Sequence, residues 1–209
     1  MHPIIAALIF LTCAACMHEP IDNPYSVFKP EMSYAEARRV ITDAAPSALD
    51  GLNETITDAM KRGKAGLGEF NALYAGIRTT SVSPRAIFLF KDDHLKFISL
   101  DYVFLPHETP PGRSENECAA IFRRVVSQMT DAFGSPTSST IKPDDTQGKE
   151  ETVTWETTTL TATTYMFIDA TRYLEVAEPR CGVINSKIFF GSKSDQKAFE
   201  AEVSAQTKQ

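Results

Sequence analysis

The stretch from residue 114 to residue 136 constrains the fold more than any other part of the chain, because it encodes one long amphipathic helix. Ser114-Glu115-Asn116-Glu117 matches a capping box, in which a serine and a glutamate three residues later satisfy free N–H groups at a helix start. Apolar residues then recur at helical spacing. They are Cys118, Ile121, Phe122, Val125, Met129 and Phe133. Gly134 and Pro136 end the helix. This pattern predicts a long helix with one face packed against the rest of the fold.

Sequence patterns typical of strands lie on both sides of this helix. Residues 86–90 and 95–104 predict a hairpin around a loop of about four residues, Lys91 to His94. Beyond the helix, segments rich in Thr, Tyr and Val suit pleated surfaces. The predicted strands are 152–157, 159–169 and 173–177, with 184–190 as a further candidate. Residues 137–150 are predicted to be a polar loop.

Helices are predicted before the hairpin. Ser33-Tyr34-Ala35-Glu36 is a second capping box, and the helix that it opens stops at Pro46. Ser47 opens another helix that ends near Gly63. Residues 70–77 fit either a short helix or an irregular strand. There is no regular alternation of strand and helix, so we expect an α+β fold: N-terminal helices, then an antiparallel sheet with one long helix packed on one face.

Composition narrows the class of protein. The 209 residues are 43% hydrophobic and 23% charged, with a formal net charge of -6. These values exclude a disordered chain, a collagen-like chain and a polytopic membrane protein. The acidic balance argues against a nucleic-acid partner, which requires a basic face. We expect a single α+β domain at 33–191, followed by a polar C-terminal tail at 192–209 that is either a short helix or frayed.

The N-terminus indicates export from the cytoplasm. An apolar run from Ile4 to Thr12 is too short for a membrane-spanning helix, which needs about 20 residues, but has the length of the central region of a signal peptide. Small residues and a cysteine follow, Cys13-Ala14-Ala15-Cys16, and the chain then becomes polar at His18. Residues 1–15 are therefore the expected signal peptide.

The sequence Cys13-Ala14-Ala15-Cys16 resembles the lipobox of bacterial lipoproteins. It departs from the family pattern at Cys13, where the family prefers leucine, and in the absence of Lys and Arg before the apolar run. The resemblance implies a diacylglyceryl group on Cys16, cleavage before it, and an acylated (palmitate-type) amino end. Met17 is not the aspartate of an inner-membrane retention signal, which implies a lipid-anchored protein in the outer membrane that faces the periplasm. The alternative is an ordinary secretory signal cut after Ala15, which would leave a soluble periplasmic or secreted protein.

The cysteine count agrees with a lipidated Cys16. Cleavage removes Cys13, and lipid on Cys16 leaves Cys118 and Cys181 as an even pair. Exported proteins usually pair their thiols, so we expect a structural Cys118–Cys181 disulfide. The alternatives are two buried free cysteines and a reactive Cys118 thiol at a helix N-terminus.

Residues 16–32 are expected to tether the domain to the membrane. Prolines at 20, 24 and 30 disfavour a helix and favour extended chain. Tyr25 and Phe28 are candidates to dock onto the domain, which would order the far end of the tether.

Known catalytic and metal-binding motifs are missing from the sequence. In the chain that remains after the expected cleavage before Cys16, no HExxH, CxxC or GxSxG occurs, and no metal site, cofactor or catalytic residue is predicted. Ser194-x-x-Lys197 lacks the partner motifs of penicillin-binding enzymes. Asp101 lies inside an apolar run. If its carboxylate is buried, it needs a partner such as Arg85 or Arg123. We favour the alternative, in which Asp101 points outward on the solvent-exposed face of the sheet.

Three functional hypotheses remain. The leading one is a non-enzymatic envelope lipoprotein that acts through protein or ligand binding, with a membrane anchor and a protein partner. The first alternative is a periplasmic inhibitor or immunity protein against a hydrolase, with an exposed acidic loop as the inserting element. The candidate binding residues are Asp92, Asp93, Asp144 and Asp145, although Asp92 and Asp93 also suit an ordinary Asx-type turn. The second alternative is an enzyme with a scattered active site, marked by a deep pocket with perturbed pKa values.

Overall fold

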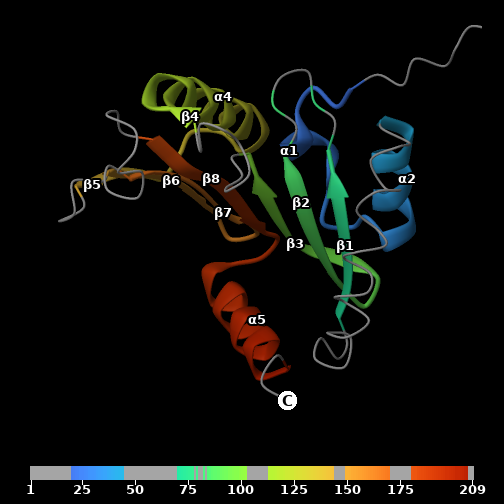
Figure 1. The fold of residues 1–209 in the computed structure, drawn as a ribbon. Coiled ribbons are helices and arrows are strands. Elements are labelled where there is room, and N and C mark those ends of the chain that lie inside the picture. Colours follow the sequence, from blue (N-terminus) through green and yellow to red (C-terminus); the bar gives the residue numbers. More distant parts are fainter. Residues whose placement is uncertain are drawn as a thin grey trace, which may run out of the picture.

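The computed structural model describes residues 20–44, 70–77, 79, 82, 84–102, 113–143, 149–169 and 180–206. In these residues the chain has an α+β fold, in which helices pack on an eight-stranded antiparallel sheet (Figure 1). The helices are α1 Pro24–Val27, α2 Tyr34–Ala44, α4 Glu115–Phe133 and α5 Lys193–Gln206. The strands are β1 Phe70–Gly76, β2 Arg85–Lys91, β3 His94–Asp101, β4 Arg113–Ser114, β5 Ser138–Pro143, β6 Lys149–Glu156, β7 Thr161–Asp169 and β8 Arg180–Phe189. The fold class expected from the sequence is confirmed.

The last strand of the chain completes the middle of the sheet. The spatial order is β1-β2-β3-β8-β7-β6-β5, and the short β4 pairs with β8 beside this path. Strand β8 runs antiparallel to both β3 and β7. It therefore joins a three-stranded unit before α4 to a three-stranded unit after it.

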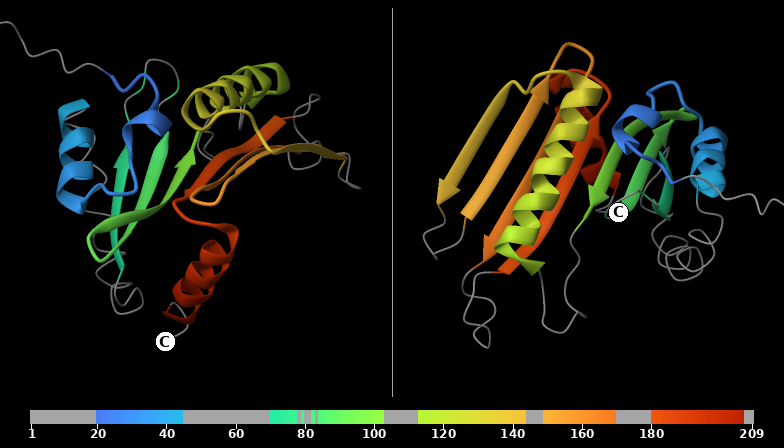
Figure 2. Two further views of the ribbon diagram at one scale, coloured as in Figure 1. Left: turned by 180° about the vertical axis from the view of Figure 1, so that it is seen from behind. Right: turned by 90° about the horizontal axis from the view of Figure 1, so that it is seen from above.

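Helix α4 forms as its sequence predicts. The capping box closes in both directions: Ser114 N–H donates to Glu117 Oε2 at 3.0 Å, and Glu117 N–H donates to Ser114 Oγ at 3.4 Å. Gly134 follows the helix with φ of 84°, a conformation that glycine adopts without strain. The helix packs against β7 and β8, and its buried residues belong to the main hydrophobic core (Figure 2). They are Cys118, Phe122, Val125 and Met129.

Trp155, the single tryptophan, is a core residue. It lies on β6 beneath α4, and only 1% of it is exposed. Its indole Nε1–H donates to the Gly134 carbonyl at 2.9 Å, so the buried donor has a partner. The same contact ties the end of α4 to the sheet.

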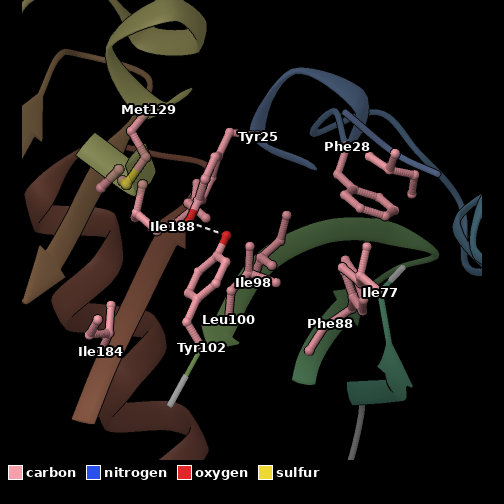
Figure 3. Packing of buried hydrophobic residues seen from close by; sticks show 14 of the residues in the cluster. Tyr25, Phe28, Ile77, Phe88, Ile98, Leu100, Tyr102, Met129, Ile184 and Ile188 are labelled. Atoms are coloured by element: carbon pink, nitrogen blue, oxygen red, sulfur yellow. Dashed lines mark hydrogen bonds between the residues drawn. The ribbon is translucent and has the colours of Figure 1, made fainter. Parts of the chain in front are cut away.

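The N-terminal segment 20–32 belongs to the hydrophobic core. Ile21, Tyr25 and Phe28 are buried, and the Phe28 ring lies 4.6 Å from the Phe88 ring of β2 (Figure 3). The expected extended chain is wrong for Pro24–Val27, which form the short helix α1. Pro24 stands at the first position of that helix, where proline is favoured because no N–H is needed there. The expected docking of Tyr25 and Phe28 is confirmed.

Two polar segments differ from their predicted form. Lys91 pairs with His94, so the hairpin loop has two residues and not four, with Asp92 and Asp93 at φ of 52° and 58°. Positive φ at both positions matches the tight turn that suits the strand twist, and aspartate tolerates it. Residues 138–143, predicted as part of a loop, form edge strand β5 because they pair with β6.

Helix α5 lies on the face of the sheet opposite α4 (Figures 1 and 2). The segment predicted as a polar tail is thus helical at Lys193–Gln206, and Phe199 buries its ring against Leu89 and Phe189. Residues 70–77, ambiguous in sequence, contain strand β1. The predicted second helix at 47–63 and the predicted strand at 173–177 lie outside the described residues.

Candidate functional site

The face of the sheet opposite α4 carries two rows of polar side chains. We call this surface the polar face. In one row, successive register partners run across β5, β6, β7, β8 and β3: Thr140, Thr152, Tyr165, Asn185 and Asp101. The parallel row is Ser138, Thr154, Thr163, Lys187 and Ser99. Directly opposed side chains share a face, and the alternating residues such as Val153 and Ile184 lie in the core beneath α4. Helix α5 packs at one end of this side of the sheet, near Phe97 and Phe189.

Asn185 is the centre of the polar face. It is 4% exposed, and its Nδ2 donates to Ser99 Oγ at 3.0 Å and to Asp101 Oδ1. Its own Oδ1 is buried and has no hydrogen-bond partner among the described residues. A buried polar atom without a partner costs about 1–3 kcal/mol. The polar face therefore contains an acceptor that a bound donor would stabilise.

Tyr165 lies beside Asn185 and is half-buried. Burial raises the pKa of its hydroxyl, and the nearby carboxylates of Asp101 and Glu150 raise it further. The hydroxyl consequently stays protonated at neutral pH and is available as a hydrogen-bond donor. The polar face thus offers a phenol donor, an amide acceptor and a carboxylate on three adjacent strands.

Asp101 takes the position that we favoured from the sequence. It lies on the polar face, partly exposed, with Arg85 as its register partner and Asn185 as its hydrogen-bond donor. Sequence reasoning did not find Asn185 itself. The only signal was an amide next to Ile184 in a largely apolar strand, and that signal does not identify its partners.

A chain of buried hydroxyl groups connects the N-terminal segment to β8 and β7 in the core, on the α4 side of the sheet. Tyr25 Oη donates to Ser186 Oγ at 2.9 Å and is 2.7 Å from Tyr102 Oη, so Tyr102 donates to Tyr25 (Figure 3). Ser186 Oγ donates to Thr164 Oγ1 at 3.0 Å, and Thr164 donates to the Asn185 carbonyl at 3.2 Å. Each buried hydroxyl is satisfied, so this network specifies how the segments pack.

The two tyrosines predict a sharp alkaline transition. Burial raises the pKa of Tyr25, against the lowering effect of its hydrogen bonds, and burial followed by the proximity of Tyr25 raises the pKa of Tyr102. Because the folded pKa values exceed the unfolded value of about 10, this contribution to stability is complete below about pH 10 and is lost as the pH rises above it. We expect phenolate absorbance from these residues to appear only together with the loss of native Trp155 fluorescence. Smooth ionisation of every tyrosine in the folded state would contradict this prediction. The Tyr25→Phe, Tyr102→Phe double variant lacks both buried phenols, so its free energy of unfolding should fall less between neutral and alkaline pH than that of the wild type.

The acidic residues proposed for binding are only partly described. Asp92 and Asp93 are exposed at the hairpin turn, and Asp93 Oδ1 accepts a hydrogen bond from the Tyr34 N–H at 3.0 Å, at the start of α2. Asp93 therefore has a role within the domain. Asp144, Asp145 and Cys16 lie outside the described residues.

Cys118 is disulfide-bonded and fully buried at the start of α4. The backbone of Cys181 pairs with Arg113 of β4, directly before that helix. This pairing brings the two cysteine positions into the same region of the fold. The identity of the Cys118 partner stays a prediction.

Other classes of site and comparisons with known proteins add no assignment. The described residues contain no group of three or more His, Cys, Asp and Glu side chains placed to hold a metal ion. None of the helices in the described ranges is long and apolar enough to cross a membrane. Comparison with protein-family models finds no match, and comparisons with curated proteins and with solved structures find none either.

Proposed function

We propose that the chain is an exported, lipid-anchored protein of the bacterial envelope, whose domain acts without catalysis by binding a partner protein on the polar face. The lipobox-like sequence ending at Cys16 supports the anchor. Anchoring through two or more acyl chains is stable, whereas one chain gives only marginal membrane binding. The disulfide at Cys118 supports folding in an oxidising compartment.

The unpartnered Oδ1 of Asn185 is the observation that carries the binding proposal. It lies in a polar row that extends over five strands, on the side of the sheet away from α4. A donor from a partner would satisfy it once the side chains that cover it move aside, while Tyr165 and Asp101 would supply a donor and an acceptor on either side. Interfaces of this kind derive specificity from matched hydrogen bonds, because a partner without the donor leaves a buried group unpaired.

A single crosslinking and fractionation experiment tests both parts of the proposal. A photoreactive residue replaces Lys187, which is exposed on the polar face; the matched control replaces Arg123, which is exposed on α4 on the opposite side. We expect the full chain in the membrane pellet, release to the soluble fraction by Cys16→Ser, and a discrete crosslinked product from position 187 but not from 123. Wild-type protein that is soluble with a free Cys16 thiol would refute the anchor, and equal crosslinking from both positions would refute the binding face. A hydrolase as the captured partner would instead identify an inhibitor or immunity protein.

A further inference from the structure

A separate cavity of about 290 Å³ lies between α5 and the ends of β2, β3 and β8. We call it the α5 pocket. Phe189, Phe190 and Phe199 line it, and the Phe189 and Phe199 rings pack with their centroids 5.3 Å apart. Gly191 permits this close packing, because a Cβ atom there would lie 2.5 Å from the Phe189 ring. Residues of α5 form one wall of the pocket, and α5 lies on the side of the sheet away from α4 (Figure 1).

A β-bulge presents Lys96 to this pocket. Leu95 pairs with Phe90 and Phe97 pairs with Leu89, so Lys96 is an extra residue without a register partner. Its carbonyl accepts a hydrogen bond from the Phe190 N–H at 3.0 Å, which places its backbone beside the end of β8. Bulges often redirect a side chain next to a functional site. Here the half-buried Lys96 lines the pocket together with the aromatic rings.

Of the two lysines that line the pocket, Lys96 is the one without a carboxylate partner. Lys91 Nζ is bound by both carboxylate oxygens of Glu202, at 2.7 and 2.9 Å. The Asp195 carboxylate accepts hydrogen bonds from the Ser192 hydroxyl and N–H, at 2.6 and 3.0 Å. Lys96 forms no ion pair with any residue that the structure describes. The pocket thus combines an unpaired ammonium group with aromatic walls.

We propose that the α5 pocket binds a small organic anion, namely a carboxylate on an aromatic body, with the carboxylate at Lys96 and the ring against Phe189 and Phe199. A carboxylate forms a charge-assisted hydrogen bond with an ammonium group, and an aromatic body gains area and ring contacts against the phenylalanines. The volume is that of a small ligand pocket with a few placed polar groups. This site is independent of the polar face, since it uses different side chains and a different class of ligand.

Binding of 1-naphthoate, compared with its uncharged analogue 1-naphthalenemethanol, tests the proposal by calorimetry on the full-length mature protein. We expect saturable binding of naphthoate, about tenfold tighter than that of the alcohol, because of the charge-assisted bond. Lys96→Met should weaken naphthoate binding about tenfold and leave the alcohol unaffected. The matched control Lys29→Met, an exposed lysine between α1 and α2 outside the pocket, should bind like the wild type.

Three results would overturn the proposal: no saturable binding of naphthoate, equal affinity for the two probes, or unchanged naphthoate binding by Lys96→Met. Thermal unfolding of each variant confirms that it is folded during the titration. If no crosslinked product forms from position 187 but naphthoate still binds, only the proposal of partner binding on the polar face is refuted. The two proposals can therefore fail separately.

Discussion

Phe28→Ala will lower the free energy of unfolding by about 3–5 kcal/mol, the usual loss for a buried phenylalanine. The ring is 1% exposed and packs against Phe88 in the main core, although the sequence places it in a proline-containing stretch before the first long helix. The cavity left by the ring would border Phe88 of β2. Urea denaturation followed by the fluorescence of Trp155, the single tryptophan, measures the change.

The matched control is Ile141→Ala on β5. Ile141 is 60% exposed and should change stability by less than about 0.5 kcal/mol. If Phe28→Ala changed stability as little as this control, residues 20–32 would be a separable tether and not part of the folded domain. The prediction thus distinguishes the two descriptions of the N-terminal segment.

Reduction of the disulfide at Cys118 will destabilise the domain by about 4 kcal/mol. We propose Cys181 as the partner, which closes a loop of about 64 residues; a crosslink of that length removes this much free energy from the unfolded chain. The bond would tie the start of α4 to β8, the strand that joins the two units of the sheet. For a domain of this size the melting temperature should fall by about 10 °C on reduction.

Peptide mapping under non-reducing conditions identifies the partner directly. The Cys118→Ala, Cys181→Ala double variant should show the lowered melting temperature without reductant and no further decrease with it. A map that joins Cys118 to another cysteine, or a melting temperature that reductant does not change, would contradict the prediction. Crosslinking from position 187 should persist after reduction, because the polar face lies away from α4.

Local sequence signals predicted the elements whose causes are local. The capping boxes at Ser33 and Ser114 predicted two helix starts, and both form with their reciprocal hydrogen bonds. The apolar stripe of α4 and the alternation around the hairpin follow from the helical and strand periods, which depend only on residues near in sequence. The α+β class followed from the order of these elements. Ser192 and Asp195 form a similar box that begins α5, so the structure confirms the short helix, one of the two forms that the sequence left open for this segment.

Tertiary structure alone decided which residues meet. Asn185 contacts Ser99 and Asp101 because β8 inserts between β3 and β7, a pairing across more than 80 residues that no local pattern encodes. The same insertion creates the polar row and leaves the Asn185 acceptor without a partner. Phe28 is a core residue because its ring packs against Phe88 of β2. The bulge at Lys96 depends on the register between β2 and β3. The sequence by itself determined the local elements, and it predicts an export signal. Long-range strand pairing, which depends on burial summed over the whole domain, determined both candidate binding surfaces.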